Sequence, residues 1–225
     1  MISEKLAPTE KQLLALNHNK MKLARKKHWE NIYKTKTPNE VSWTQKIPKT
    51  SLNFIYSYGL PKDAKIIDIG GGDSTLVDYL LHEGYENISV LDISGNALQK
   101  VKDRLGEKAG KINWIESDIM DFKPNTTFDV WHDRAAFHFL KTHEQISKYV
   151  EIASKFVRGY LILGTFSEEG PKKCSGLEIN QYSETSLTDI LKKNFKKIQC
   201  IEEIHTTPFR TKQSFLFCSF IKQLT

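Results

Sequence analysis

The sequence predicts an α/β fold with a doubly wound, mostly parallel, seven-stranded sheet, an N-terminal helical extension and a C-terminal antiparallel strand pair. The first observation is that short apolar runs alternate with helical segments from residue 65 onward, which is typical of parallel strands joined by helices. The second is that two long apolar runs close the chain with a short connection and no helix between them. Such a pair can only be antiparallel.

The first segment is predicted to be helical and basic. Thr9-Glu10-Lys11-Gln12 resembles a capping box, and leucines follow at helical spacing, so we expect one or two helices over residues 9–34. Residues 1–36 hold nine Lys/Arg and three acids, whereas the rest of the chain balances 24 bases with 24 acids. We therefore divide the chain into a basic helical extension, 1–27, and a main domain, 28–225.

The remaining elements follow from apolar runs, glycines and prolines. A helix that Pro61 stops precedes the alternation, and Gly84 ends the first helix within it. Strands are expected at 65–69, 88–92, 112–116, 128–132, 160–166, 196–204 and 214–222, and helices at about 50–59, 74–84, 95–106, 143–156 and 184–194.

A glycine loop follows the first predicted strand. The run Lys65-Ile66-Ile67-Asp68-Ile69 leads into Gly70-Gly71-Gly72, and twenty residues after Gly72 a second apolar run ends in Asp92. Glycines allow the backbone to approach a ligand closely, and a carboxylate after the second strand can accept hydrogen bonds from both ribose hydroxyls. The pattern predicts an enzyme that uses a nucleoside-bearing cofactor.

The loop favours one cofactor over another. A nicotinamide dinucleotide loop reads Gly-x-Gly-x-x-Gly/Ala, but the third position here is Thr75. Asp68 would also repel a pyrophosphate, whereas it would attract the α-ammonium group of S-adenosylmethionine. Asp68-Ile69-Gly70-Gly71-Gly72 matches the acid-x-Gly-x-Gly pattern of S-adenosylmethionine loops.

On these residues the chain resembles the class I S-adenosylmethionine-dependent methyltransferases, a Rossmann-like family, over about residues 28–225. Ser74 stands where such families often place glycine. The segment Trp131–Leu140, WHDRAAFHFL, together with Cys174-Ser175-Gly176-Leu177, resembles a subgroup of small, mostly bacterial methyltransferases without assigned substrates. The other motifs that carry the resemblance are Asp68-x-Gly70-x-Gly72, Asp92, Ser117-Asp118-Ile119, Phe128-Asp129-Val130 and the closing strand pair.

The resemblance implies a set of residues that bind the cofactor. Asp68 and the Gly70, Gly71 and Gly72 backbone should hold the methionine part, Asp92 the ribose, and Ile93 one adenine face. Asp118 should accept from the adenine amino group, with the Ile119 N–H beside it. In similar methyltransferases a segment like the one that carries Trp29, Tyr33 and Trp43 folds over the cofactor. The alternatives are a helix N-cap for Asp92, a turn residue for Asp118, a core residue for Ile93 and packing for the N-terminal aromatics.

The chemistry is expected at the end of the fourth strand. His132 and Asp133 should border the methyl group and the acceptor, and His138 follows in the same segment. The alternatives are an internal Asp133–Arg134 charge pair and a packing role for His138. The histidines show no metal-ligand spacing, so no metal site is expected.

The acceptor is expected to be a small molecule, because the body has no added recognition domain. A protein lysine is the alternative, since Asp133 could orient an ammonium group. RNA modification through the basic extension comes next, but nucleic acid is disfavoured because aromatics are not interleaved with the basic residues. Enzymes that methylate base amino groups are also disfavoured, because their Asn/Asp-Pro-Pro-Tyr/Phe motif is replaced here by His132-Asp133-Arg134-Ala135.

The cysteines and the hydropathy indicate a compartment. Cys174, Cys200 and Cys218 are odd in number and far apart in the sequence, which fits neither a disulfide framework nor a zinc site. Reduced thiols and a cytoplasmic location are expected. No apolar stretch approaches the roughly 20 residues that span a bilayer, so no membrane partner is expected.

Overall fold

The computed structural model describes residues 10–223 of the 225-residue chain. Most predicted elements are confirmed to within a few residues, and β1, β3 and α5 match the expected bounds. The strands are β1 Lys65–Ile69, β2 Asn87–Asp92, β3 Ile112–Glu116, β4 Phe128–Arg134, β5 Val157–Phe166, β6 Lys173–Cys174, β7 Leu177–Glu178, β8 Phe195–Thr206 and β9 Lys212–Lys222, and the α-helices are α1 Glu10–Thr35, α2 Lys49–Ser57, α3 Leu76–His82, α4 Gly95–Leu105, α5 His143–Phe156 and α6 Glu184–Leu191.

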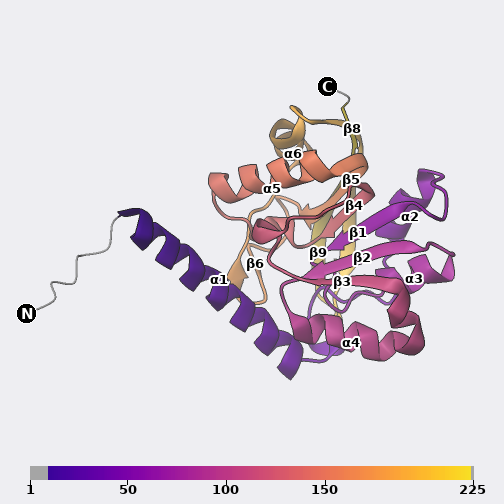
Figure 1. Ribbon diagram of the computed structural model, residues 1–225, viewed down its shortest axis with the longest axis horizontal. Helices are drawn as coiled ribbons and strands as arrows, with labels where there is room; N and C mark the ends of the chain where they lie inside the picture. Colours follow the sequence, from indigo (N-terminus) through magenta and orange to yellow (C-terminus); the bar gives the residue numbers. More distant parts are fainter. Residues whose placement is uncertain (1–9, 224–225) are drawn as a thin grey trace, which may run out of the picture.

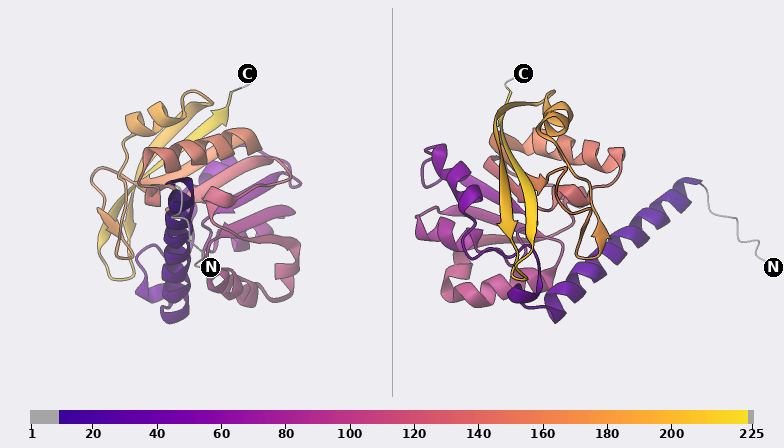
Figure 2. Two further views of the ribbon diagram at one scale, coloured as in Figure 1. Left: turned by 60° about the vertical axis from the view of Figure 1, so that its left-hand side comes forward. Right: turned by 180° about the vertical axis from the view of Figure 1, so that it is seen from behind.

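Seven strands form one sheet in the order β3-β2-β1-β4-β5-β9-β8. The first five are parallel to one another, and β9 pairs antiparallel with both β5 and β8. This arrangement confirms the predicted sheet and its closing pair, which lie side by side at one edge (Figure 1; Figure 2, right). The strand order reverses between β1 and β4, and open α/β sheets bind ligands at the carboxyl ends of the strands at such a point.

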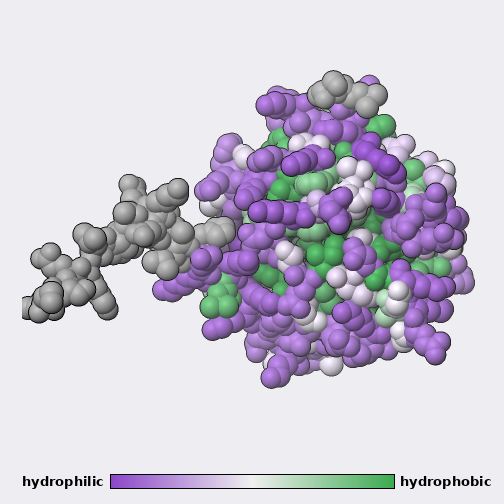
Figure 3. Space-filling view, viewed as in Figure 1, coloured by the Kyte–Doolittle hydropathy of each residue, from purple (hydrophilic) through white to green (hydrophobic). Residues whose placement is uncertain are grey.

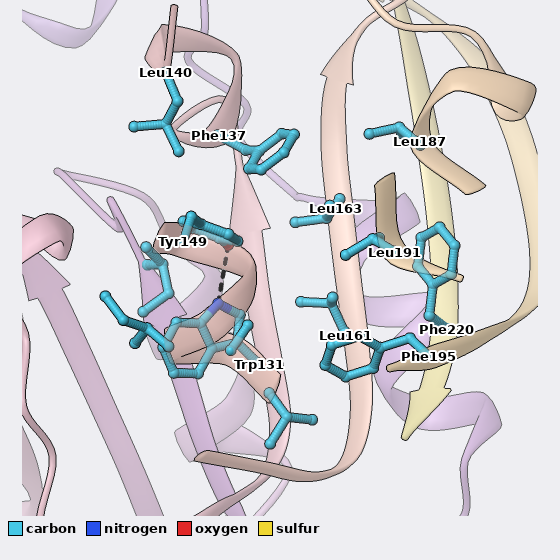
Figure 4. Close-up of a cluster of buried hydrophobic side chains, with 14 of the residues drawn as sticks. Trp131, Phe137, Leu140, Tyr149, Leu161, Leu163, Leu187, Leu191, Phe195 and Phe220 are labelled. Carbon is cyan, nitrogen blue, oxygen red and sulfur yellow. Dashed lines mark hydrogen bonds between the residues drawn. The ribbon is translucent and has the colours of Figure 1, made fainter. Parts of the chain in front are cut away.

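Helices cover both faces of the sheet because strand side chains alternate. Ile67 and Ile69 of β1 belong to a buried cluster that includes residues of α5 and α6, whereas Ile66 belongs to one that includes residues of α2, α3 and α4. Figure 4 shows the first cluster, in which the indole N–H of Trp131 donates to the hydroxyl of Tyr149, 2.9 Å away. Strands that are buried on both faces explain the nearly continuous apolar runs of the sequence.

The N-terminal segment forms one continuous helix. The predicted boundary between residues 27 and 28 falls inside α1, whose C-terminal part lies against α4. The N-terminal part of α1 leads away from the sheet (Figures 1 and 2).

The predicted loop after β5 contains a small hairpin that sequence reasoning missed. Its strands, β6 and β7, are two residues each and pair only with each other among the described residues. Strands this short carry no periodicity to detect.

Two cysteines correct the expectation of three reduced thiols. Cys200 and Cys218 form a disulfide between β8 and β9, while Cys174 is free and buried. The pair lies far apart in the sequence, but the antiparallel register places the two residues directly opposite each other. The prediction was wrong because it considered linear spacing and not strand pairing.

The described surface is mainly polar. Figure 3 shows hydrophilic residues over most of one face, with apolar residues gathered near its middle. Among the residues that the structure describes, no helix is both long and apolar enough to cross a membrane.

Candidate active site

A cavity of about 380 Å³ opens at the carboxyl edge of the sheet, where the strand order reverses. Its walls come from the ends of β1, β2, β3 and β4, from the segment that follows α1, and from α1 itself. The lining includes most of the predicted cofactor residues: Trp29, Tyr33, Trp43, Asp68, Gly70, Gly71, Asp92, Ile93, Asp118 and Ile119. The fold thus brings together residues that lie far apart in the chain.

The glycine loop owes its composition to close packing and to its backbone conformation. A Cβ at Gly71 would lie 2.6 Å from the Cγ1 of Val90 and 2.9 Å from the Oδ2 of Asp68. Gly72 adopts a φ of 53°, a region in which L side chains are rare. Gly72 does not line the cavity; its N–H donates to Asp92 Oδ2 at 2.9 Å and so ties the loop to the end of β2.

Asp92 presents a buried carboxylate to the cavity, with 5% of its surface exposed. Its Oδ1 accepts from the Ser94 N–H at 2.8 Å, and each oxygen has a further lone pair for a ligand. Burial raises the pKa of Asp92 to about 7, against the hydrogen bonds from Ser94 and Gly72 that lower it, and the nearby Asp68 adds to the rise. The N-cap of α4 is Ser94, whose hydroxyl accepts from the Ala97 N–H, so Asp92 is not that cap.

The sequence left two roles open for Asp118, a turn residue and a cofactor-binding residue, and its position in the structure is compatible with both. Its Oδ1 accepts from the Met120 N–H at 3.0 Å, which fixes the 3-10 turn Ile119–Asp121. Its Oδ2 lies 2.6 Å from the Nη2 of Arg25, and both residues line the cavity. Asp118 is therefore a turn residue and a cavity residue at once.

Ion pairs attach helix α1 to the part of the cavity wall near the end of β3. Three of its bases face three acids of β3 and of the segment that follows it. Except for Asp118, the partners are partly exposed, so each of the other two pairs stabilises weakly and is screened by salt. The pairs are Lys22–Asp121 at 2.5 Å, Arg25–Asp118 at 2.6 Å and Lys26–Glu116.

A carboxylate of α1 also holds the start of α4. Glu30 accepts from the Gly95 N–H at 2.8 Å, the Asn96 N–H at 3.1 Å and the Ser94 hydroxyl at 3.0 Å. Burial works to raise the pKa of Glu30, but the hydrogen bonds from Asn96, Gly95 and Ser94 outweigh it and hold the pKa below its usual range. A carboxylate at a helix N-terminus accepts hydrogen bonds from the free N–H groups there. It also interacts favourably with the positive end of the helix dipole.

Aromatic side chains form an apolar wall of the cavity. Ring centroids lie 5.9 Å apart for Trp29 and Trp43, 6.3 Å for Tyr33 and Trp43, and 5.1 Å for Trp29 and Phe139. All four residues line the cavity, so packing with one another and contact with a ligand are compatible. Sequence reasoning found the first three and missed Phe139.

His132 lies in the cavity wall with both ring nitrogens engaged. Its Nδ1 is 2.7 Å from Asp68 Oδ1, and its Nε2 is 2.8 Å from Ser51 Oγ. The side chain is buried, and Ser51 belongs to α2. The imidazole therefore holds Asp68 in place.

Asp133 does not reach the cavity, contrary to expectation. It is fully buried, its Oδ1 accepts from the N–H groups of Ala136 and Phe137, and its Oδ2 accepts from the Tyr149 hydroxyl at 2.8 Å. Neighbouring residues of a strand point to opposite faces, so His132 faces α2 while Asp133 faces α5. Burial raises the pKa of Asp133 to about 6, and its hydrogen bonds fix the turn after β4.

His138 is also absent from the cavity lining that the described residues form. It is fully buried and stacks on Phe166, with ring centroids 4.8 Å apart. Burial, and then the charge of Arg134, lower the pKa of His138 to about 3. His138 therefore has the packing role that the sequence left open as an alternative.

Arg134, which the sequence offered only as a charge partner of Asp133, lines the cavity. Its Nη1 donates to the Trp43 carbonyl oxygen at 2.9 Å. Strand alternation gives the signal that could have found it, because residues 132 and 134 must share a face. Among residues 10–223 no group of three or more potential metal ligands gathers.

This sheet order, with a glycine loop after β1 and acids after β2 and β3, defines the class I fold of S-adenosylmethionine-dependent methyltransferases. Residues 66–158 match the family described as a methyltransferase domain. Over these residues the chain matches the S-adenosylmethionine-dependent methyltransferases, and its fold is that of class I.

Its relatives are distant. It is 25% identical over 119 residues to the mouse (Mus musculus) eEF1A lysine and N-terminal methyltransferase, covering 52% of this chain and 17% of the relative. It is 27% identical over 105 residues to malonyl-[acyl-carrier protein] O-methyltransferase 2 of Ilyobacter polytropus, covering 46% and 40%. The matched region thus spans less than half the length of either relative.

A solved structure covers nearly the whole chain. The 1,6-didemethyltoxoflavin-N1-methyltransferase of Burkholderia thailandensis, with bound 1,6-didemethyltoxoflavin and S-adenosylhomocysteine, aligns with a TM-score of 0.62 and 14% identity. The alignment covers 99% of this chain and 94% of that one.

Proposed function

We propose that this protein transfers a methyl group from S-adenosylmethionine to a small-molecule acceptor by in-line displacement. The observation that carries the proposal is the cavity of about 380 Å³, in which the acids Asp68, Asp92 and Asp118, two glycines and an aromatic wall meet. This volume lies in the lower part of the range of small-molecule pockets.

The cavity residues fit the cofactor on structural grounds. Asp92 and Asp118 are buried carboxylates with lone pairs left for ribose hydroxyls and an adenine amino group, and Ile93 and Ile119 supply apolar contact. Asp68 offers a carboxylate for the α-ammonium group beside the Gly70–Gly71 backbone. When bound, the cofactor supplies the reactive methyl carbon.

The protein's own contribution is position and exclusion of water. Trp29, Tyr33 and Trp43 shield the cavity from one side, and Glu30 and Arg25 keep α1 over it. His132 is proposed to border the transfer site and to orient Asp68. A general base is required only for an acceptor that arrives protonated. Asp133 and His138 are not part of the proposed site, because their contacts lie elsewhere.

Calorimetric titration tests the cofactor assignment. S-adenosylmethionine should bind with a micromolar Kd and NADH should show no binding, because Asp68 repels a pyrophosphate. A screen of small acceptors, read by the appearance of S-adenosylhomocysteine, then tests the reaction. Binding of NADH in place of S-adenosylmethionine would contradict the proposal.

Methylation of a protein lysine is the second candidate, favoured by the likeness to the mouse eEF1A lysine and N-terminal methyltransferase. Its support from this chain is weaker, because Asp133 is buried away from the cavity. RNA modification has the weakest support of the three, because the bases of the extension form ion pairs with acids of the body. These bases are Lys22, Arg25 and Lys26. Methylation of a peptide library, with a small-molecule panel in parallel, distinguishes the two leading candidates.

A further inference from the structure

Arg134 is a partly buried cation in the cavity wall, and no salt bridge joins it to an acid among the described residues. It is the last residue of β4, and its Nη1 hydrogen-bonds the Trp43 carbonyl oxygen. Its Nε and Nη2 are shielded from solvent and have no hydrogen-bond partner among residues 10–223. Burial lowers the pKa of Arg134 to about 10, so the guanidinium is still charged at neutral pH.

The neighbouring groups do not neutralise this charge. Glu203 and Asp68 act on this charge from a distance, but the hydrogen bonds that they form go to other groups: Asp68 Oδ1 to His132, and Glu203 to Thr50 and, at 2.9 Å, to Gln45. Cys174, also in the wall, is a neutral thiol because burial raises its pKa to about 12.

A buried charge without a partner is expensive, and a guanidinium fork matches a carboxylate in shape. The backbone beside Arg134 holds this arrangement in place. Ala135 has a φ of 68°, unusual for a residue with a side chain, and its N–H donates to the Gly164 carbonyl oxygen at 2.8 Å. Strain of this kind persists where the surroundings enforce it, and it often marks a binding site.

Arg134 lies apart from the acids that are proposed to bind the cofactor. Asp118, Asp92 and Asp68 follow the edge of the sheet from β3 through β2 to β1. Arg134 comes next, on β4, and its guanidinium lies over the ring of Phe215 on β9, 4.9 Å from the centroid. The three acids would hold the cofactor along β3, β2 and β1, which would leave the β4 side of the cavity for the acceptor.

We propose that Arg134 anchors a carboxylate of the methyl acceptor, so the substrate class is a small carboxylate with an apolar body. This inference rests on the proposed function and adds the substrate class. The apolar body would contact Trp29, Trp43 and Phe139, which line the same cavity. The carboxylate completes the guanidinium's hydrogen bonds and positions the molecule for attack on the methyl group.

Benzoate and benzamide are matched probes, because they share shape and differ in charge. Each is titrated into protein saturated with S-adenosylhomocysteine. Wild-type protein should bind benzoate roughly tenfold or more tightly than benzamide, as expected for charge-assisted hydrogen bonds. Arg134→Gln should reduce this preference to within about twofold, and Arg134→Lys should retain part of it, because it keeps the charge and loses the fork.

The possible results separate the explanations. Equal binding of the two probes, or no benzoate binding, in the wild type overturns the proposal, as does an unchanged preference in Arg134→Gln. If Arg134→Gln instead weakens S-adenosylhomocysteine about tenfold and keeps the preference, the guanidinium serves the cofactor's own carboxylate. Failure of the wild type to bind S-adenosylhomocysteine refutes the proposed function itself, independently of the probes.

Thermal unfolding of the ligand-free variants tests whether Arg134 has a purely structural role. Arg134→Gln should melt no lower than wild type, because it removes a charged group whose Nε and Nη2 are shielded from solvent and have no partner among the described residues. A fall of several degrees together with an intact benzoate preference would assign Arg134 to folding and overturn the proposal.

Discussion

At the scale of the residue, Asp92 is the group on which cofactor recognition should depend most. We predict that Asp92→Ala weakens S-adenosylmethionine binding by about 1.5–3 kcal/mol, the range for hydrogen bonds to a charged group. Calorimetry provides the measurement. Asp129→Ala is the matched control, because Asp129 bonds to Arg158 and the Lys65 N–H outside the cavity. Unchanged affinity in Asp92→Ala would remove the ribose assignment.

The raised pKa of Asp92, about 7, predicts a pH dependence. Ribose hydroxyls donate to the ionised carboxylate, so affinity should rise with pH up to about 7 and level off above it. The same group affects folding in the opposite sense: its stabilisation is complete below the unfolded pKa near 3.8 and is lost as pH rises through about 7. Titrations from pH 5 to 8 check the binding trend, and Asp92→Asn should flatten it. A rise that persists in Asp92→Asn assigns the proton to another group.

Gly72 and Tyr33 should be coupled, because a Cβ at position 72 would collide with the Tyr33 hydroxyl. We predict that Gly72→Ala weakens cofactor binding and lowers the melting temperature, since its φ of 53° is also unfavourable for alanine. Tyr33→Phe should restore part of the loss, which a double-mutant cycle measures. Strict additivity of the two substitutions would show that the collision is relieved elsewhere.

At the scale of the element, α1 is held over the cavity by Glu30 and three ion pairs. We predict that Glu30→Ala speeds hydrogen exchange of backbone amides in residues 20–35, because α1 loses its attachment to the start of α4. Lys27→Ala, an exposed position on the same helix, is the control. Equal exchange in the two variants would show that the ion pairs suffice. Salt should amplify the effect by screening those pairs.

At the scale of the whole molecule, the Cys200–Cys218 disulfide fastens the edge strand β8 to β9. A loop of this length predicts a stabilisation of up to about 3 kcal/mol from chain entropy. Reduction, or the Cys200→Ser/Cys218→Ser pair, should lower the melting temperature. Cofactor affinity should not change, because neither cysteine lines the cavity. A loss of affinity with unchanged stability would contradict this separation of edge and site.

Local patterns in the sequence determined most of the elements and the cofactor motif. The apolar runs of β1 and β3, the period of α5 and the spacing from Gly72 to Asp92 are properties of neighbouring residues, and such signals survive without the fold. The acids that line the cavity were predicted for the same reason, because their positions at strand ends can be recognised in the sequence.

The tertiary structure alone decided which polar groups reach the cavity and which are used internally. His132 and Asp133 are equal candidates in sequence, but the pleat sends one to α2 and the cavity wall and the other to Tyr149. The disulfide, the contacts of α1 and the unpaired charge of Arg134 likewise depend on neighbours that are distant in the chain. Solvent exposure and hydrogen-bond partners depend on tertiary packing. The role of a polar residue is therefore determined only once the chain has folded around it.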